Sequence, residues 1–383
     1  MAAPLRILTV IGARPQIIKS AALSRALNGP FKGRIEESLL HTGQHYDANM
    51  SQVFFDELGL PPAAMNLNIG SGSAGATTGR MIEGIEAVLL RKEHDVLVIY
   101  GDTNSTLAGA IAASKVQVPV VHIEAGLRSF NKSMPEEVNR VMADHCSTWL
   151  FCPTETAVVN LEREGFKREA QGHPTADQPH VMNCGDVMYD NTLHFSSLHD
   201  GVDLFARSGL EKEAYALVTV HRQQNADDPK RLATIFNGLI EAHRRHALPL
   251  VVPIHPRTRK MMDSFLDPLL LRTLDQTKGI HLIPPVGFLD MLALERHARL
   301  IITDSGGVQK EAFFMQKPCV ILRAETEWVE LVQHGQSTLV DADPERFQHA
   351  LDRYLKDSAP ECPPLFGDGR AAERICEQLL AHR

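Results

Sequence analysis

The stretch DVLVIYGDTNSTLAGAIAASKVQVPVVHIEAG, residues 95 to 126, decides the fold class. It contains two apolar runs, 95–101 and 118–124, with a helical pattern at 103–115 between them. Runs that are apolar almost without interruption are typical of parallel strands covered on both faces. A strand, a helix and a second strand in this order form a βαβ unit.

The same alternation extends in both directions from this stretch. In the first half we expect strands at 5–12, 37–43, 148–153 and 180–185, and helices at 15–27, 78–92, 135–145 and 154–165. The pattern breaks in the polar stretch 190–213 and restarts with expected strands at 215–220, 248–255, 280–286, 299–304 and 318–322. The sequence therefore predicts an α/β protein with two doubly wound parallel sheets and a terminal helix within 367–380.

Composition sets the class of protein. The 383 residues are 44% hydrophobic and 22% charged, which is ordinary globular usage for two domains. A formal charge of -8 argues against duplex nucleic acid or an anionic membrane as the main partner. No apolar run reaches the roughly 18 residues of a spanning helix, and no signal peptide is recognisable, so we expect a cytoplasmic protein. The six cysteines form no C-x-x-C pair, and we expect no metal site.

Ligands of open parallel sheets bind beyond the carboxyl ends of the strands. The first strand ends in Gly12-Ala13-Arg14-Pro15, and Pro15 suits the first position of a helix. Arg14 and Lys19 then lie near a helix N-terminus, where an anion such as phosphate would offset cations that oppose the helix dipole. The alternative is that both are surface cations.

Two further strands are followed by carboxylates, Asp102 and Glu124. Asp102 has an alternative use as the cap of a helix beginning at Thr103. Glu124 is harder to explain structurally, because glutamate caps helices poorly and a charge at a strand end needs a partner or a ligand.

The segment after Glu124 contains more charges. Ser133 and Glu136 fit the capping box S-x-x-E, which would give Glu136 a structural role. Glu136 and Arg140 are four residues apart on one helical face, where they would pair or share an anionic ligand. We assign Glu137 and Asp144 to the outward face of this helix.

The second half repeats the pattern of polar residues after strands. His221 with Arg222, and then His255, follow two expected strands, and Ser305, Gly306 and Gly307 open a helix expected to begin near Val308. Small residues at such a turn allow backbone N–H groups to approach a pyrophosphate. Glu311 would lie in the first turns of that helix, where a carboxylate accepts hydrogen bonds from ribose hydroxyls. A structural histidine is the alternative for His221.

Nine motifs together resemble the non-hydrolysing UDP-N-acetylglucosamine 2-epimerase family, whose members interconvert UDP-GlcNAc and UDP-ManNAc. In chain order they are GARPQIIK, GDTNSTLAGA, HIEAGLRS, MPEEVNR, NCGDVMYD, TVHRQQN, PIHPR, TDSGGVQKEA and FGDGRAAERI. The match runs nearly from end to end, and it is the common order that makes it specific.

The resemblance implies a GT-B type fold, in which two Rossmann-like domains face each other across a cleft that holds UDP. The implied domains are 1–190 on the sugar side, 191–366 on the UDP side, and a helix at 367–383 that returns to the first domain. It further implies a UDP-sugar substrate, no cofactor, a homodimer, and a role in cell-surface polysaccharide precursor synthesis. The implied catalytic residues are Asp102, Glu124, Glu136, His221 and Lys19. The implied substrate-binding residues are Arg14, Arg140, His255, Phe288, Ser305, Gly306, Gly307 and Glu311.

The chain departs from the family pattern at two places. Gln44, His45, Arg80 and Arg222 match positions where some members bind a second UDP-GlcNAc as an activator, but this chain reads GQHY where those members usually read AQHR. RAETEWVE, residues 323–330, replaces the TTERPE-like text of the plain UDP-GlcNAc enzymes. It is more similar to members acting on UDP-2,3-diacetamido-2,3-dideoxyglucuronate.

Four activities fit this resemblance. Besides a non-hydrolysing epimerase acting on either sugar, they are a hydrolysing epimerase, a GT-B glycosyltransferase and a non-catalytic UDP-sugar sensor. An epimerase needs two acid/base groups, cations on the leaving diphosphate, and a site that excludes water.

Overall fold

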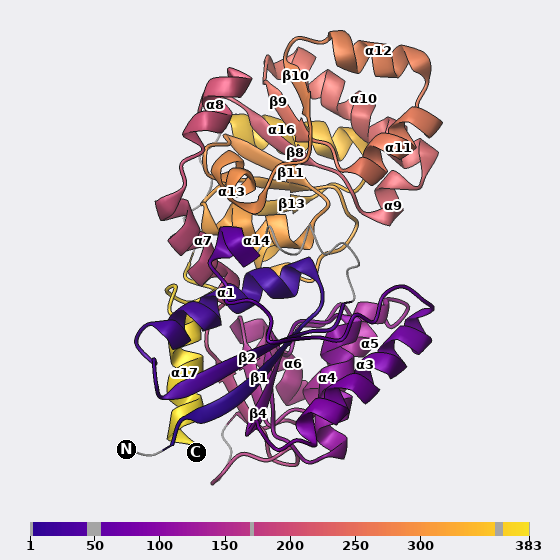
Figure 1. Ribbon diagram of the computed structural model, residues 1–383. Coiled ribbons are helices and arrows are strands. Elements are labelled where there is room, and N and C mark those ends of the chain that lie inside the picture. Colours follow the sequence, from indigo (N-terminus) through magenta and orange to yellow (C-terminus); the bar gives the residue numbers. More distant parts are fainter. Residues whose placement is uncertain (1–2, 44–54, 169–171, 357–362, 383) are drawn as a thin grey trace. The chain divides into compact units, whose positions relative to one another are not determined.

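The computed structural model describes residues 3–43, 55–168, 172–356 and 363–382. The chain divides into two compact units: unit 1, Met1–Leu193 with Pro364–Arg383, and unit 2, His194–Pro363. Each unit has its own parallel sheet covered by helices (Figure 1). Unit 1 is therefore formed from two separate segments of the chain.

The sheet of unit 1 has the strand order β3-β2-β1-β4-β5-β6-β7 within the described residues, and every pair is parallel. Its strands are β1 (Leu5–Ile11), β2 (Ile35–His41), β3 (Met65–Asn66), β4 (Val96–Tyr100), β5 (Val120–Ile123), β6 (Trp149–Cys152) and β7 (His180–Asn183). The order reverses between β1 and β4. This reversal is the topological switch point at which open α/β sheets bind ligands.

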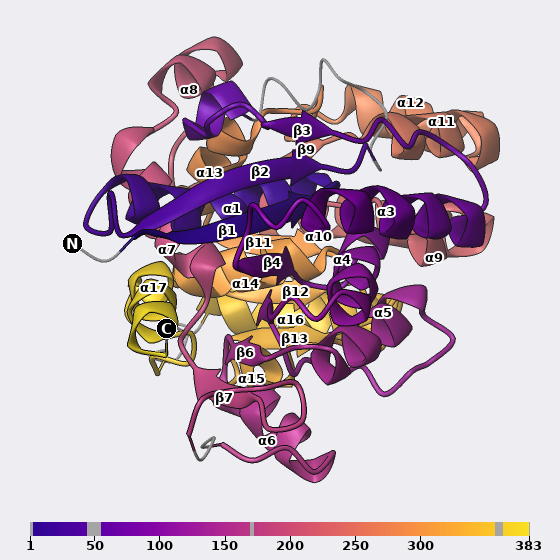
Figure 2. The same cartoon turned by 60° about the horizontal axis from the view of Figure 1, so that its bottom comes forward.

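The helices of unit 1 follow its strands along the chain. They are α1 (Arg14–Asn28), α3 (Ala74–Leu89), α4 (Asn104–Lys115), α5 (Pro135–His145), α6 (Glu155–Arg163), α7 (Val187–Leu198), which extends into unit 2, and α17 (Ala371–Ala381). Helices α3, α4 and α5 pack side by side (Figure 2). Helix α17 packs against α1, and its first amides, of Ala371 and Ala372, donate to the Asp190 carboxylate at 3.0 and 2.8 Å.

Unit 2 repeats the topology, with the described strands in the order β10-β9-β8-β11-β12-β13 and all pairs parallel. The strands are β8 (Ala216–Thr219), β9 (Leu250–Pro253), β10 (Ile280–Ile283), β11 (Leu300–Thr303), β12 (Cys319–Ile321) and β13 (Ser337–Leu339). The helices are α8 (Val202–Ser208), α9 (Gln223–Ala226), α10 (Pro229–His246), α11 (Pro256–Phe265), α12 (Pro268–Gln276), α13 (Phe288–Arg296), α14 (Gly306–Phe314), α15 (Val329–Gln333) and α16 (Pro344–Lys356). Its switch point lies between β8 and β11.

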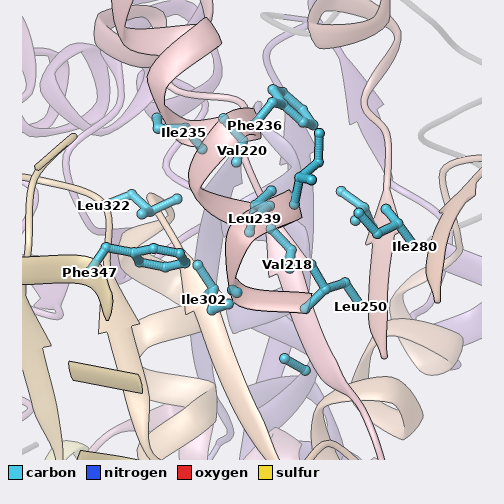
Figure 3. Packing of buried hydrophobic residues seen from close by; sticks show 14 of the residues in the cluster. Val218, Val220, Ile235, Phe236, Leu239, Leu250, Ile280, Ile302, Leu322 and Phe347 are labelled. Carbon is cyan, nitrogen blue, oxygen red and sulfur yellow. The ribbon is translucent and has the colours of Figure 1, made fainter. Parts of the chain in front are cut away.

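A dense apolar core fixes the sheet of unit 2. Leu239 of α10 and Phe347 of α16 pack with Val218, Leu250 and Ile302 of the strands (Figure 3). All five are nearly inaccessible to solvent, and burying one such side chain stabilises the fold by about 1.5–3 kcal/mol. The strands therefore hold their carboxyl ends, and the loops that follow, in fixed positions.

The predicted α/β fold with parallel sheets is confirmed, and a strand forms in every predicted run. The prediction missed β3 and β13, which are short edge strands without a long apolar run. The break at 190–213 contains the end of α7 and all of α8. None of the helices that the structure describes combines the length and apolarity needed to cross a membrane.

Candidate active site

The switch point of unit 1 is held together by Gln16, a residue that the sequence analysis did not select. Its side-chain oxygen accepts from the amides of Gly12 and Ala13, at 2.9 and 3.2 Å. Its side-chain nitrogen donates to the carbonyl of Tyr100 and to the hydroxyl of Thr106. One buried amide thus links the loop after β1 to the end of β4 and the start of α4.

The two cations at α1 have different environments. Arg14 is the first residue of α1 and is exposed, as expected for a residue beside a helix N-terminus. Lys19 is largely buried, and its Nζ forms an ion pair with Oε2 of Glu124. The alternative of two surface cations is therefore wrong for Lys19.

Asp102 follows β4 and does not cap the next helix. The N-cap of α4 is Thr103, whose hydroxyl accepts from the amide of Thr106. The Asp102 carboxylate instead pairs with Arg140, and its side chain is 31% exposed. A partly exposed carboxylate beside a guanidinium is available to a ligand.

Glu124 follows β5 in a conformation that non-glycine residues rarely adopt, with φ at +70°. The amides of Glu124 and Ala125 both donate to the carbonyl of Phe151, at 3.1 Å. The side chain is buried and pairs with Lys19. Backbone strain and a buried charge at one residue both cost free energy, and such costs concentrate at functional sites.

The turn at Gly101 brings these groups together. A methyl group at Gly101 would lie 3.0 Å from Nζ of Lys19 and 3.8 Å from Oε2 of Glu124. Asp102 is the next residue along the chain. The turn that follows β4 and the side chain that follows β5 therefore lie against each other.

Arg140 joins this group from α5. It donates to Glu137 at 2.6 Å and pairs with Asp102. Burial lowers the pKa of Arg140, but the charges of Asp102, Glu137 and Glu124 together raise it. The arginine is therefore a fixed cation among three carboxylates.

Two expectations for the start of α5 are wrong. The N-cap is Met134, and no side chain caps the helix, so the capping box of Ser133 and Glu136 does not form. Ser133 hydrogen-bonds to Asn131 instead, because a tight polar turn precedes the helix. Glu136 is exposed, and the buried Glu137 replaces it as the partner of Arg140 within the helix.

The outward placement of Glu137 and Asp144 is also wrong, because both are buried. Glu137 accepts from the amides of Ser129 and Phe130 at 2.9 Å, which orders the loop before α5. Asp144 accepts from His122 and Arg128 at 2.7 Å and from the amide of Gly126. Partners supplied by distant parts of the chain turn both carboxylates inward.

In unit 2 the carboxylate that follows a strand of the switch point, as Asp102 does in unit 1, is Asp304. It follows β11 and is fully buried. It accepts from the amides of His221 and Arg222 and from the side chain of Asn225, all at 3.1 Å. Nδ1 of His221 lies 3.7 Å away. Asp304 thus ties the loop after β8 to the end of β11. It was predictable by the same strand-end criterion as Asp102 and Glu124.

Helix α14 begins at Gly306, two residues earlier than expected, with Ser305 as its N-cap. The Ser305 side chain does not cap the helix. A methyl group at Gly306 would clash with Oε1 of Glu327, whereas the space at Gly307 is open. The first turn therefore presents backbone N–H groups beside small residues, which is the arrangement that binds phosphate.

Glu311 lies further along α14 and has an unexpected neighbour, Glu295 of α13. Burial and the neighbouring Glu311 together raise the pKa of Glu295 well above its usual range. Glu295 is fully buried and Glu311 nearly so. Burial and the like charge of Glu311 therefore both favour the neutral form of Glu295.

Two further residues of unit 2 were selected from the sequence. His255 is the N-cap of α11: its Nδ1 accepts from the amide of Arg257 at 3.2 Å, and its ring lies 6.3 Å from that of His221. Phe288 is buried and packs edge-on against Phe195. His255 thus lies beside His221, whereas Phe288 belongs to the packing of unit 2.

Comparison with known proteins gives the family. The model of the UDP-N-acetylglucosamine 2-epimerase family matches residues 31–380. The chain is 44% identical to the UDP-2,3-diacetamido-2,3-dideoxy-D-glucuronate 2-epimerase of Pseudomonas aeruginosa, with 98% of this chain and 99% of that protein covered. It is 42% identical to the UDP-N-acetylglucosamine 2-epimerase of Methanocaldococcus jannaschii, with 97% of each covered.

The chain belongs to the UDP-N-acetylglucosamine 2-epimerase family. It is therefore an isomerase with a GT-B fold. The crystal structure of the M. jannaschii UDP-GlcNAc 2-epimerase in complex with UDP-GlcNAc and UDP matches with a TM-score of 0.85 at 41% identity, covering 98% of this chain and 100% of that one. The Neisseria meningitidis UDP-GlcNAc 2-epimerase bound to UDP-GlcNAc matches with a TM-score of 0.84 at 27% identity, covering 98% and 100%.

The positions at which some members of the epimerase family bind an activator are only partly described. Gln44 and His45 lie outside the described residues. Arg80 of α3 is exposed and donates to the carbonyl of Ser71 at 3.3 Å. Arg222 is 39% exposed, with its guanidinium 3.9 Å from Glu327. Among the described residues, no group of three histidine, cysteine or acidic side chains is arranged to hold a metal ion.

Proposed function

We propose that the chain is a non-hydrolysing 2-epimerase of a UDP-2-acetamido sugar, converting UDP-GlcNAc to UDP-ManNAc. The observation that carries this proposal is the cluster of Asp102, Glu124, Lys19 and Arg140 at the strand ends of unit 1. A nucleotide diphosphate alone favours cations, so carboxylates at such a place indicate acid/base work on the sugar.

The chemistry of the substrate explains this need. The C2 proton is not acidic, because C2 carries an acetamido nitrogen and no carbonyl group is attached to it. A base must remove the proton while the C1–O bond breaks and UDP leaves with the bonding electrons. The product is 2-acetamidoglucal beside UDP. Protonation of C2 on its other face and return of UDP to C1 give the epimer.

We assign acid/base work on the sugar to unit 1 and nucleotide binding to unit 2, with the helix at 367–383 belonging to unit 1. Glu124 and Asp102 are the leading acid/base groups, with Glu136 and His221 as further candidates. The strain at Glu124 and its pairing with Lys19 support a fixed position for this carboxylate. Arg14 and Lys19 act on the diphosphate.

In unit 2 the diphosphate binds at Ser305, Gly306 and Gly307, where α14 begins. His255 lies beside His221 of the loop after β8, and Asp304 binds that loop to the end of β11. The ribose binds to Glu311. Phe288 contributes to the uracil site only by shaping it, because its ring is buried.

A second candidate substrate is UDP-2,3-diacetamido-2,3-dideoxyglucuronate. It is favoured by the identity to the P. aeruginosa enzyme and by Trp328, which replaces the arginine of the TTERPE-like text. Nζ of Lys310 lies 4.3 Å above the Trp328 ring, and both residues are buried. This cation–π pair therefore marks the place where the chain differs from the plain UDP-GlcNAc enzymes.

The decisive experiment incubates the purified protein with each UDP-sugar in heavy water and follows the products by NMR. We expect the C2 epimer with the nucleotide still attached and with deuterium at C2. Free sugar and UDP would indicate a hydrolysing epimerase, and retention of protium at C2 in every product would contradict the base mechanism. Binding of UDP without turnover of either sugar would indicate a sensor.

The resemblance to the family also supports a cytoplasmic homodimer without a cofactor, acting in cell-surface polysaccharide precursor synthesis. Light scattering after gel filtration tests the dimer. A monomeric mass at micromolar protein concentration would contradict it.

A further inference from the structure

The buried ring of His122, on β5, makes two hydrogen bonds to oxygen atoms. Nδ1 lies 2.7 Å from Oδ1 of Asp144, and Nε2 lies 2.8 Å from the carbonyl oxygen of Gly101. A carbonyl oxygen only accepts, and a carboxylate only accepts. A neutral imidazole has one donor and one acceptor nitrogen, so it satisfies only one of these contacts.

Asp144 is ionised. Burial raises the pKa of Asp144. The charges and hydrogen bonds of His122 and Arg128 lower it by more, so the pKa lies below its usual range. Its second oxygen accepts from Arg128 at 2.7 Å and from the amide of Gly126 at 3.2 Å. All of its partners therefore donate, which leaves it no proton to give to Nδ1 of His122.

We infer that His122 donates from both ring nitrogens and, with Asp144, sets the positions of the two turns carrying Asp102 and Glu124. His122 is a positioning residue, because its ring hydrogen-bonds to Asp144 and to the carbonyl of Gly101 and acts on Asp102 and Glu124 through the backbone. The inference rests on the proposed function for its catalytic consequence, but the protonation state of the ring can be tested without it.

Other side chains surround the pair. Arg128 pairs with Asp144 and also, through Nε, with Glu164 at 2.6 Å, and Nε2 of His145 lies 3.5 Å from Glu164. Burial, followed by the charge of Asp144, raises the pKa of the Cys152 thiol on β6 well above its usual range.

The backbone contacts show what the pair positions. His122 holds the carbonyl of Gly101, which belongs to the peptide group of Asp102. Asp144 holds the amide of Gly126, two residues after Glu124. The amide of Gly101 donates to the carbonyl of Ile123 at 3.0 Å, so a direct backbone hydrogen bond also joins the two turns. Loss of either hydrogen bond of His122 would therefore leave the positions of Asp102 and Glu124 relative to each other less well fixed.

Histidine-selective ¹⁵N labelling of the full chain tests the protonation state. The spectrum is recorded under the conditions of the kinetic assay. We expect one histidine to keep both ring nitrogens protonated, and its signal to be missing from His122→Asn and His122→Gln. A His122 ring with one unprotonated nitrogen under these conditions would overturn the inference.

Steady-state kinetics of the same variants test the positioning role. His122→Asn keeps a donor near Asp144 and loses the one to Gly101, so we expect kcat to fall roughly 10- to 100-fold with KM little changed, the scale of a small misplacement of reacting groups. In His122→Gln the longer amide reaches Gly101, and we expect a smaller fall. His334→Asn, at an exposed histidine of unit 2, is the control and should retain wild-type kcat.

The outcomes separate the two proposals. Wild-type kcat in His122→Asn would overturn the positioning role, whereas an inactive wild type would overturn the proposed function. In the latter case, hydrogen exchange of peptides covering 95–126 replaces kcat as the readout. Faster exchange in His122→Asn than in His334→Asn is then expected, and equal exchange would overturn the role.

Discussion

The two units have the same topology but treat their buried carboxylates differently. In unit 1, Asp144 accepts from the side chains of His122 and Arg128. In unit 2, Asp304 accepts from backbone amides and an asparagine, and burial with the neighbouring Glu311 raises the pKa of Glu295. One fold thus stabilises its buried carboxyl groups in two ways.

The difference matches the division of labour proposed above. Proton transfer needs charged groups whose positions and pKa values are set by other charges. Phosphate binding needs backbone N–H groups that are held in place. Asp304 accepts from the backbone amides of His221 and Arg222 and so holds the loop after β8 beside the start of α14.

The largest expected effect is the difference in lost stability between Asp144→Asn in unit 1 and Asp304→Asn in unit 2. Asp144→Asn leaves the buried guanidinium of Arg128 and the ring of His122 short of a charged acceptor, and we expect a loss of about 3–5 kcal/mol in the stability of unit 1. Asp304→Asn keeps an oxygen for the backbone amides, so we expect about 1–3 kcal/mol in unit 2. Hydrogen exchange of peptides from each unit measures both losses.

The pH dependence sharpens this test. Because the folded-state pKa of Asp144 is lowered, its contribution is present above the unfolded value of about 3.9 and is lost as the pH falls through the folded value. The deficit of Asp144→Asn should therefore shrink below about pH 4. Equal losses in the two units, at every pH, would contradict the electrostatic contrast.

The next effect concerns turnover. We expect Glu124→Gln to lower kcat roughly 10²-fold or more, the scale of a lost acid/base group, while the fold is retained. Glu83→Gln, the same change at an exposed position of α3, is the control. Near-normal epimerisation by Glu124→Gln, measured by NMR, would remove Glu124 from the mechanism.

A smaller effect is expected for the nucleotide. A methyl group at Gly306 displaces Glu327 and crowds the start of α14, so we expect UDP to bind to Gly306→Ala roughly tenfold more weakly. Gly75→Ala on α3 is the control, because its methyl group meets no atom within 4 Å. Calorimetric titration with UDP measures both. Equal affinities would argue against the diphosphate site at this turn.

The smallest effect is expected for Glu295→Gln. Glutamine has nearly the size of the neutral form of glutamic acid, so UDP affinity should change by less than about threefold, a fraction of one hydrogen bond. The folded-state pKa of Glu295 is raised, so stability from its neutral form is present below the unfolded value of about 4.3 and is lost as the pH rises through the folded value. Glu295→Gln should therefore gain stability relative to the wild type as the pH rises above about 4.3. A constant difference would show that Glu295 is ionised.

Much of the fold could be predicted from the sequence, because apolar runs identify parallel strands wherever both faces of the sheet are covered. The short edge strands β3 and β13 could not, since half-covered edges carry no such run. The strand-end criterion located Asp102 and Glu124, and it would equally have located Asp304. Nothing local distinguishes Glu136 from Glu137, although one is exposed and the other is buried.

The misplaced Asp144 shows where pattern reasoning ends. A carboxylate on a helix is predicted to face water because burying an unpaired charge is costly. Its partner His122 lies 22 residues away, and Arg128 meets Glu164 across 36 residues. Only the folded sheet brings these groups together, so their burial depends on tertiary structure that no short window contains.

The two-segment construction of unit 1 has a consequence for synthesis on the ribosome. Helix α17, which packs on α1, is translated only after the whole of unit 2. Unit 2 is continuous in the chain and can fold as soon as it emerges, whereas unit 1 must wait with one side of α1 uncovered. A nascent chain stalled before residue 364 would therefore expose that surface to chaperones, and unit 2 would be complete before unit 1.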